Sequence, residues 1–107
     1  MPKQELEANG YEIIECNFYC RFGEIDIIAK DGEYIVFCEV KYRKDKVTGE
    51  PAEAVGYKKQ KRISMSAMYY MTKKYNTVDI PFRFDVVSIL QDNIEIIKNA
   101  FEARMEK

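Results

Sequence analysis

An Asp-Gly pair between two apolar runs constrains the fold of this 107-residue chain more than any other feature. Residues 23–30 and 33–41 are rich in β-branched and aromatic side chains, and Asp31-Gly32 separates them. Asp and Gly tolerate the positive φ angles of a type I′ turn, and such a pair between apolar runs is a strong hairpin signal. The sequence therefore predicts an antiparallel hairpin with a two-residue loop at Asp31-Gly32.

The predicted register gathers charged side chains at one end of this hairpin. Counting outward from the turn places Glu24 opposite Glu39. Because side chains alternate between the two faces of a strand, Asp26 and Lys41 emerge on the same face as these two residues. Like charges that lie opposite each other destabilise a strand pair. We therefore expect a further interaction to hold the three carboxylates and the amine together.

Both faces of the hairpin also carry apolar side chains. Ile28 and Ile35 share the face of the carboxylates. The opposite face is apolar along its length: Ile25, Ile27, Val36, Cys38 and Val40. A sheet that is apolar on both faces is typical of a fold with helices packed on each side.

Composition places the chain among ordinary globular proteins. It is 47% apolar and 33% charged, its net charge is −1, and its length suits one domain over residues 1–107. No apolar run approaches the roughly 20 residues of a membrane span, and the polar start lacks the apolar segment of a signal peptide. We therefore expect a single soluble domain in the cytoplasm.

Cysteine and histidine usage excludes several classes of site. The three cysteines, Cys16, Cys20 and Cys38, are odd in number, which disfavours a disulfide framework and favours a reducing compartment. Cys16 and Cys20 have no second Cys or His pair to complete a zinc site. The chain has no histidine, so Ser-His and Cys-His nucleophilic schemes are excluded. Any catalysis depends on carboxylates, lysines, tyrosines or a metal.

Charge is unevenly distributed along the chain. Residues 41–62 contain eight basic and three acidic side chains, a net charge of +5, whereas the rest of the chain carries −6. A basic segment that starts at the carboxylate cluster suits a polyanion whose phosphate approaches a metal. A solvated loop and helix face is the alternative interpretation of the same charges.

Periodicity and turn residues predict an α/β domain around the hairpin, with a mixed sheet of about five strands flanked by helices. The expected helices cover residues 2–9, 51–75 and 99–107, with Pro51 in a first-turn position. The expected strands outside the hairpin cover residues 11–18, 82–90 and 94–97, and residues 42–50 are expected to form a loop.

Two motifs of the hairpin resemble the Asp…Glu-x-Lys core of the PD-(D/E)xK nuclease superfamily. They are Glu24-Ile25-Asp26 and Phe37-Cys38-Glu39-Val40-Lys41. More narrowly, the chain resembles the small, uncharacterised YraN-like family of bacteria, in residues 21–29, 36–43, 53–55 with Lys59, 62–63, 83–87 and 99–101. That family is regarded as related to archaeal Holliday-junction resolvases. The resemblance implies a restriction-endonuclease-like core with a shortened N-terminal helix, and a magnesium-dependent phosphodiesterase that acts on DNA.

The chemistry of the hairpin residues agrees with that resemblance. Mg²⁺, or Mn²⁺ in its place, prefers hard oxygen ligands, which Asp26 and Glu39 can supply from adjacent strands. The resemblance adds the Val40 carbonyl as a third ligand. Lys41 is expected either to orient or deprotonate the attacking water or to stabilise charge on the phosphorane, and both roles stay open. Glu24 is expected to be a further ligand or a hydrogen-bond acceptor beside the metal.

Basic residues after the motif are candidates for nucleic-acid contacts. Arg43 follows Lys41, and Lys59 and Arg62 lie on the expected helix. Asp85, on a later strand, is expected to be a structural hydrogen-bond acceptor.

One difference from the family pattern concerns the first helix. Family members carry an acidic residue in a Gly-Glu pair well before the segment that matches Tyr11, and in the related resolvases a first-helix Glu contributes to the metal site. Only ten residues precede Tyr11 here, so that position is absent from this sequence. A truncated start, compensation by Glu24 or Glu5, and a weakened site all stay open. A homodimer also stays open, because a shortened helix exposes apolar surface.

Three functional hypotheses follow. The first is a metal-dependent nuclease on branched or structured DNA, and the second is a nucleic-acid-binding module that keeps the fold without efficient cleavage. The third is a structural or protein-interaction domain with a solvated acidic face. The Asp26, Glu39 and Lys41 set favours the first, whereas the missing helix residue and the isoelectric point of about 5.6 keep the second open.

Overall fold

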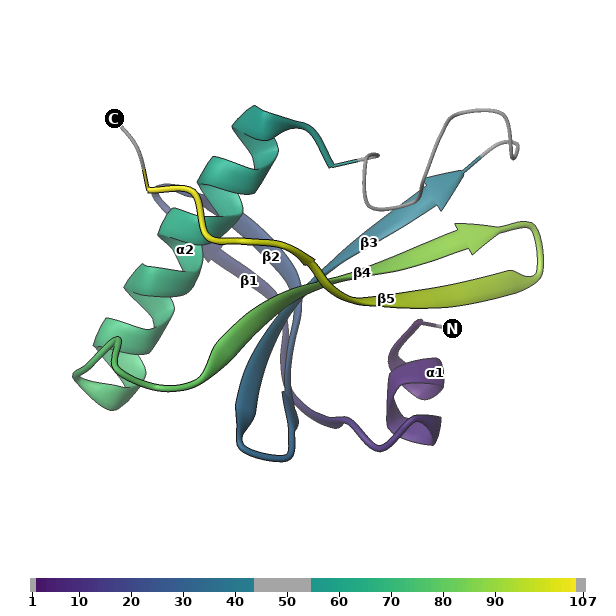
Figure 1. Ribbon diagram of the computed structural model, residues 1–107, viewed down its shortest axis with the longest axis horizontal. Helices are drawn as coiled ribbons and strands as arrows, with labels where there is room; N and C mark the ends of the chain where they lie inside the picture. The colour runs from purple at the N-terminus through teal and green to yellow at the C-terminus, as the bar shows by residue number, and fades with distance from the viewer. Residues whose placement is uncertain (1, 44–54, 106–107) are drawn as a thin grey trace.

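The computed structural model describes residues 2–43 and 55–105 (Figure 1). Two helices and five strands follow one another in the order α1 (Pro2–Ala8), β1 (Glu12–Cys20), β2 (Gly23–Asp31), β3 (Tyr34–Arg43), α2 (Tyr57–Tyr75), β4 (Phe82–Leu90) and β5 (Asn93–Phe101). Among the described elements, no helix is long and apolar enough to cross a membrane.

All five strands form one mixed sheet in the order β1-β2-β3-β4-β5. The pairs β1–β2, β2–β3 and β4–β5 are antiparallel, and β3–β4 is parallel. Parallel neighbours need a crossover connection, and α2 lies within that connection. The predicted α/β fold with a five-stranded mixed sheet is confirmed, and it is consistent with a restriction-endonuclease-like core.

The sheet separates two apolar clusters, as the two-faced hairpin predicted. On one face, α2 packs through Ile63, Ala67 and Met71 against residues that include Ile28 and Phe37. On the other face, Leu6 of α1 and Tyr11 pack with a second cluster: Ile27, Ala29, Val36, Cys38, Val87 and Ile89. Figure 1 shows the two helices at separate places on the sheet, with α2 running obliquely across β1 and β2.

Helix α2 is shorter at its start than the sequence predicts. Gly56 is its N-cap, and Val55 and Gly56 are not helical, so the helix begins at Tyr57. The predicted start at Pro51 lies outside the described residues. At the other end Asn76 adopts a left-handed conformation with φ of 59° and its N–H donates to the Thr72 carbonyl, as expected for a C-terminal stop.

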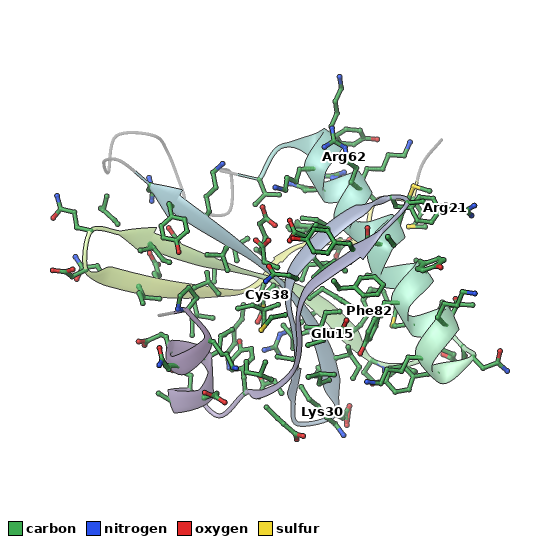
Figure 2. All side chains as sticks on the ribbon, turned by 180° about the vertical axis from the view of Figure 1, so that it is seen from behind. Glu15, Arg21, Lys30, Cys38, Arg62 and Phe82 are labelled. Atoms are coloured by element: carbon green, nitrogen blue, oxygen red, sulfur yellow. The ribbon has the colours of Figure 1, made fainter. Side chains whose placement is uncertain are left out.

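The hairpin forms, but its predicted register is wrong by two residues. Asp31 pairs with Tyr34, so the loop is Gly32-Glu33 rather than Asp31-Gly32. Gly32 has φ of +62° at the first loop position, where a type II′ turn favours glycine. Asp31 stays in the strand, where its carboxylate accepts a hydrogen bond from Arg83 at 2.6 Å. Figure 2 shows Lys30 at this end of β2 and Arg21 at the opposite end.

A second correction concerns the faces of β2. Ile25 and Ile28 both belong to the cluster under α2, whereas Ile27 belongs to the opposite cluster. Strict alternation would put Ile25 with Ile27, as predicted, so the alternation is interrupted at Asp26. The neighbouring strand is irregular at the same level, because Asn17 of β1 has φ of 54°. The carboxylate therefore lies at a local distortion of the sheet.

The end of the chain differs from the prediction. Strand β5 extends to Phe101, and residues 102–105 form no regular structure, so the helix predicted over 99–107 is wrong within the described residues. Phe101 stacks on Phe84 of β4 with ring centroids 4.9 Å apart, and Asn99 has φ of 53°. This aromatic contact and the left-handed kink favour the strand over the helix.

A buried cluster of charged groups holds the α1 side together. Asp85 of β4 is fully buried, and its Oδ2 accepts a hydrogen bond from the Tyr11 hydroxyl at 2.6 Å. Its Oδ1 accepts from the Arg83 Nε at 3.0 Å and from the Asn99 N–H at 2.9 Å. Arg83 in turn binds Asp31. We call these residues the Asp85 cluster, and they account for Asp85 as a structural acceptor.

Candidate active site

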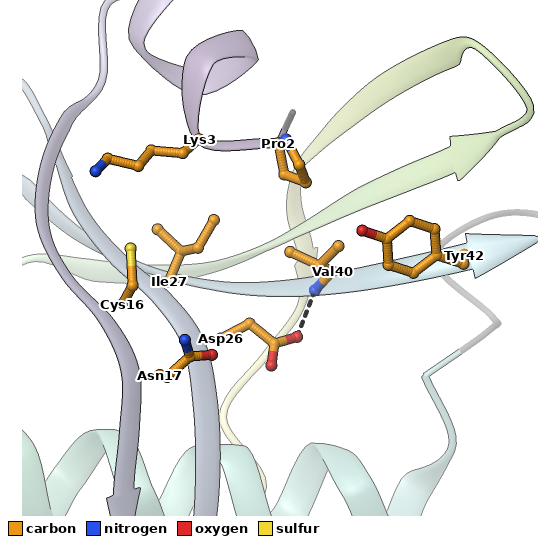
Figure 3. Close-up of a pocket in the computed structure, with 8 residues that line it drawn as sticks. All are labelled: Pro2, Lys3, Cys16, Asn17, Asp26, Ile27, Val40 and Tyr42. Atoms are coloured by element: carbon orange, nitrogen blue, oxygen red, sulfur yellow. Dashed lines mark hydrogen bonds between the residues drawn. The ribbon is translucent and has the colours of Figure 1, made fainter.

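The two carboxylates predicted to bind a metal lie where β2 and β3 separate. The ladder between these strands ends at the pair Ile27–Cys38, so the next residues outward are Asp26 and Glu39. The prediction that Glu24 lies opposite Glu39 is therefore wrong, because the shifted register puts Asp26 there instead. Asp26 Oδ2 accepts a hydrogen bond from the Val40 N–H at 2.8 Å (Figure 3). This bond anchors Asp26 across the gap between the strands.

Glu39 is a buried carboxylate, with only 5% of the residue exposed. Its Oε2 accepts the Lys59 ammonium at 2.7 Å. Burial raises the pKa of Glu39 to about 7, against the lowering effect of Lys59. The Asp26 charge and a hydrogen bond to Asp26 raise the pKa further, because both favour the protonated form. One cation thus balances the two carboxylates incompletely.

Lys59 contacts this carboxylate pair from outside the hairpin. It lies in the first turn of α2, and the structure places its ammonium on Glu39, with 53% of its side chain exposed. Hydrogen bonding to Glu39 raises the pKa of Lys59, and the charges of Asp26 and Glu24 add to this effect. Its expected role as a nucleic-acid contact stays a prediction. The cluster of lysines at residues 58–61 indicated a basic segment in the sequence. The partner of Lys59, however, depends on how the helix crosses the sheet.

Glu24 and Lys41 lie beside the pair rather than within it. Glu24 pairs with Tyr19 across the β1–β2 ladder and its carboxylate hydrogen-bonds the Tyr19 hydroxyl, which raises the pKa of that tyrosine. Lys41 is exposed on β3, two residues beyond Glu39 and in register with Ser88 of β4. The structure therefore brings Glu39 into contact with Lys59 and places Asp26 beside Glu39, and it leaves Glu24 and Lys41 at the margin.

The other candidates are distributed around this centre. Val40 follows Glu39 on β3, and its N–H is used by Asp26. Arg43 ends β3, and Arg62 is exposed on α2, one turn after Lys59. Glu5, the alternative source of a third acid, accepts hydrogen bonds from the Asn9 side chain at its carbonyl and its carboxylate within its own helix.

A hollow of about 380 Å³ opens beside Asp26 on the α1 side of the sheet. Figure 3 shows the residues that line it: Pro2, Lys3, Cys16, Asn17, Asp26, Ile27, Val40 and Tyr42. Lys3 and Asn17 were not predicted as site residues. No motif in the sequence indicated either residue, and Asn17 adopts a left-handed conformation with φ of 54°.

The donor set fits a hard divalent cation. Asp26 and Glu39 offer carboxylate oxygens side by side, and Mg²⁺ commonly takes one or two carboxylates and completes its shell with water and phosphate. Over residues 2–43 and 55–105, no group of three or more His, Cys, Asp or Glu side chains that could hold a metal is found. A cation at the pair would compete with the Lys59 ammonium for Glu39.

Several proteins similar to this chain carry the name UPF0102. A UPF0102 protein of Syntrophus aciditrophicus is 50% identical over 107 residues, which cover 95% of this chain and 83% of that protein. A second, from Lachnoclostridium phytofermentans, is 47% identical over 98 residues, with 92% and 83% of the two chains covered. A third, from Geotalea uraniireducens, is 48% identical over 102 residues, with 91% and 80% covered.

The family expected from the motifs is also matched directly. The sequence profile of the uncharacterised protein family UPF0102 matches residues 2–89, a range that contains the hairpin, α2 and nearly all of β4. The resemblance to a small uncharacterised bacterial family is therefore confirmed. The chain belongs to the uncharacterised protein family UPF0102.

Proposed function

We propose that this protein is a metal-dependent endonuclease that hydrolyses phosphodiester bonds of branched or otherwise structured DNA, and that it belongs to the PD-(D/E)xK superfamily. The observation that carries the proposal is the juxtaposition of Asp26 and Glu39 at the point where two strands separate, with lysines on either side. Like charges gathered in this way reduce the stability of a sheet, so they need a reason other than folding.

In the proposed reaction Asp26 and Glu39 would hold Mg²⁺ or Mn²⁺, and the family resemblance adds the Val40 carbonyl. When bound, the ion supplies Lewis acidity at the phosphate and lowers the pKa of coordinated water. Asp26 is already oriented by the Val40 N–H, so little reorganisation is required of it. Burial of Glu39 keeps its carboxylate away from bulk water, which strengthens electrostatic interactions.

Two lysines have separate roles in this proposal. Lys41, exposed near the pair, orients the attacking water or stabilises charge on the phosphorane. Lys59 neutralises Glu39 in the free protein. With a cation held by Asp26 and Glu39, the Lys59 ammonium would be available to bind a substrate phosphate, with Arg43 and Arg62 as further contacts. The free thiols among the described residues suit the reducing cytoplasm, where we place the activity.

A nucleic-acid-binding module without cleavage is the second candidate. The Lys59–Glu39 ion pair favours it, because an internal cation already balances the carboxylate that a metal would need. A purely structural domain leaves the basic residues near the pair without a role.

Cleavage assays on labelled four-way junction, flap and single-stranded DNA test the proposal. We expect scission with Mg²⁺ or Mn²⁺, none with EDTA, and loss of scission in Asp26→Asn and Glu39→Gln. Asp26→Asn is the sharper variant, because its amide oxygen can still accept the Val40 N–H. Glu95→Gln, an exposed change on β5, serves as the matched control and should remain active.

Each contrary result has a defined meaning. Cleavage that needs no metal, or that survives both substitutions, overturns the assigned site. Salt-sensitive DNA binding without scission favours the binding module. Absence of DNA binding at low salt leaves the structural domain.

A further inference from the structure

A groove beside the candidate active site combines basic and aromatic side chains. It measures about 510 Å³ and lies between the β1–β2 turn and the first half of α2. The turn contributes Arg21 and Phe22, and the helix contributes Tyr57, Lys58, Lys61 and Arg62. We call it the basic groove. Figure 2 shows Arg21 and Arg62 at the same end of the molecule, away from Lys30.

We infer that the basic groove binds unpaired nucleotides of single-stranded DNA. This inference rests on the proposed function and deepens it, because it names the part of a DNA substrate that the site recognises. It assigns a binding role to Arg21, Phe22, Tyr57, Lys58 and Lys61 and adds to the role expected of Arg62.

The charges of the basic groove are not balanced by neighbours in the described part of the chain. Within residues 2–43 and 55–105, no carboxylate forms an ion pair with Arg21, Lys58, Lys61 or Arg62, whereas Lys59 between them is bound to Glu39. The first turn of α2 contains no acidic residue. Cations that share one groove repel each other, and a polyanion relieves that repulsion while it releases its own counterions.

The aromatic rings of the basic groove favour a ligand that carries a base over a bare phosphate. Tyr57 is 51% exposed at the groove, and Phe22 is half-buried with the Arg21 guanidinium 4.8 Å from its ring centroid. The Tyr69 ring of α2 packs edge to face against Phe22, with ring centroids 6.1 Å apart. Proteins that bind single strands pair such rings with basic side chains, because the rings stack on bases and the charges follow the backbone. In a duplex the base faces are stacked on one another and are not accessible.

The basic groove adjoins the carboxylate pair through both elements that form it. Phe22 is followed directly by Gly23 and Glu24 at the start of β2, which leads to Asp26. A Cβ built on Gly23, whose φ is +145°, would lie 3.7 Å from the Arg62 Cβ, so the turn packs closely on the helix. Lys59 lies one turn before Arg62 and contacts Glu39. A strand held in the basic groove therefore has its neighbouring phosphates close to Asp26 and Glu39.

Fluorescence polarisation with a labelled thymidine oligonucleotide of about 20 nucleotides tests the inference in EDTA, where cleavage plays no part. We expect tighter binding to this single strand than to a duplex of equal length or to an abasic oligonucleotide. Phe22→Leu and Tyr57→Leu should each weaken single-strand binding about 5- to 100-fold and leave duplex binding almost unchanged. Lys58→Ala and Arg62→Ala should weaken both and reduce the salt slope by about one each.

Matched controls separate the basic groove from general charge effects. Lys30→Ala and Tyr34→Leu change a lysine and a tyrosine at the exposed tip of the β2–β3 hairpin, and both should bind like the wild type. Thermal unfolding of every variant checks that it is folded. Equal affinity for single strand, duplex and abasic strand overturns the inference, and so does unchanged binding by folded Phe22→Leu and Tyr57→Leu.

The same assay separates this inference from the proposed function. Asp26→Asn should abolish cleavage and keep single-strand binding. A wild-type protein that binds the single strand through Phe22 and Tyr57 but never cleaves refutes the nuclease and leaves the groove assignment intact. A protein that cleaves junctions equally well with and without Phe22 and Tyr57 refutes the groove assignment alone.

Discussion

Two places in this molecule bring carboxylates and cations together, and they differ in how completely the charges are satisfied. In the Asp85 cluster, a fully buried carboxylate accepts hydrogen bonds from Tyr11, Arg83 and Asn99. At the candidate active site, Glu39 has one ammonium as its ion-pair partner and another carboxylate beside it. Buried charges are tolerated when they are paired and hydrogen-bonded. The Asp85 cluster is therefore built for stability, and the incompletely balanced pair is suited to receive a ligand.

The two places lie at opposite ends of the β2–β3 hairpin. One end of β2 and β3 carries Asp31, which binds Arg83 and so ties the hairpin to β4. The other end carries Asp26 and Glu39, where the ladder has stopped. The strands thus hold a closed network at one end and an open pair at the other. Four predictions separate these roles, from the largest expected effect to the smallest.

Asp85→Ala should destabilise the protein strongly, whereas Asp26→Asn should change its stability little. Removal of Asp85 leaves the Arg83 guanidinium, which is 13% exposed, without its buried partner, and breaking such a pair costs about 3–5 kcal/mol. Asp26→Asn keeps the acceptor for Val40, so we expect a cost below about 1 kcal/mol. Urea unfolding measures both, and equal losses would remove the distinction between the two places.

The two places should respond oppositely to pH. Burial raises the pKa of Glu39 from 4.5 to about 7, so the folded state binds the proton more tightly and loses stability as pH rises between these values. The loss is about 3–4 kcal/mol at ~1.4 kcal/mol per pKa unit. Glu39→Gln should flatten the curve of unfolding free energy against pH in this window.

Acidification acts on the Asp85 cluster instead. Hydrogen bonding to Arg83 lowers the pKa of Asp31 below 3.8. The contribution of ionised Asp31 to the free energy of unfolding is therefore complete above pH 3.8 and is lost as pH falls through the folded pKa. An Asp31→Asn variant should lose less stability on acidification than the wild type. A free energy of unfolding of the wild type that rises from pH 4.5 to 7 would contradict the account of Glu39.

Divalent cations should stabilise the protein through the active-site pair alone. Mn²⁺ at ten times its dissociation constant contributes about 1.4 kcal/mol if it binds only the folded state, which corresponds to about 4–8 °C in the unfolding temperature of a domain of this size. Glu39→Gln should abolish the shift at neutral pH, and Asp31→Asn should retain it. An equal shift in both variants would place the cation elsewhere.

Two tyrosines give the smallest contrast. Tyr11→Phe removes the hydroxyl that donates to Asp85 and should cost about 1 kcal/mol. Tyr19→Phe removes a hydroxyl that bonds Glu24 on an exposed residue, and its effect on stability should stay within about 0.5 kcal/mol. Urea unfolding of the two variants under the same conditions compares them, and a larger cost at Tyr19 would reverse the assignment.

Local sequence was enough to predict much of this architecture. The Asp-Gly pair predicts the hairpin, apolar residues on both faces predict the covered sheet, and helical periodicity predicts α2. These features depend on neighbours within a few residues. The charged group at one end of the hairpin is also local, because Asp26, Glu39 and Lys41 lie on two strands joined by a short turn.

Long-range contacts account for what the sequence did not predict. The register shifts by two residues because Asp31 binds Arg83, 52 positions away. Residues 99–101 belong to strand β5 because Phe101 stacks on Phe84. Lys59 reaches Glu39 only because α2 crosses back over the sheet. None of these partners can be identified from spacing or propensity.

The most direct test of the central claim is a crystal structure of the protein grown with Mn²⁺ and measured at the manganese absorption edge. The account predicts an anomalous peak that contacts carboxylate oxygens of both Asp26 and Glu39, with the Lys59 ammonium displaced from Glu39. Lys59 still bound to Glu39, with no peak between the two carboxylates at a saturating Mn²⁺ concentration, would contradict it.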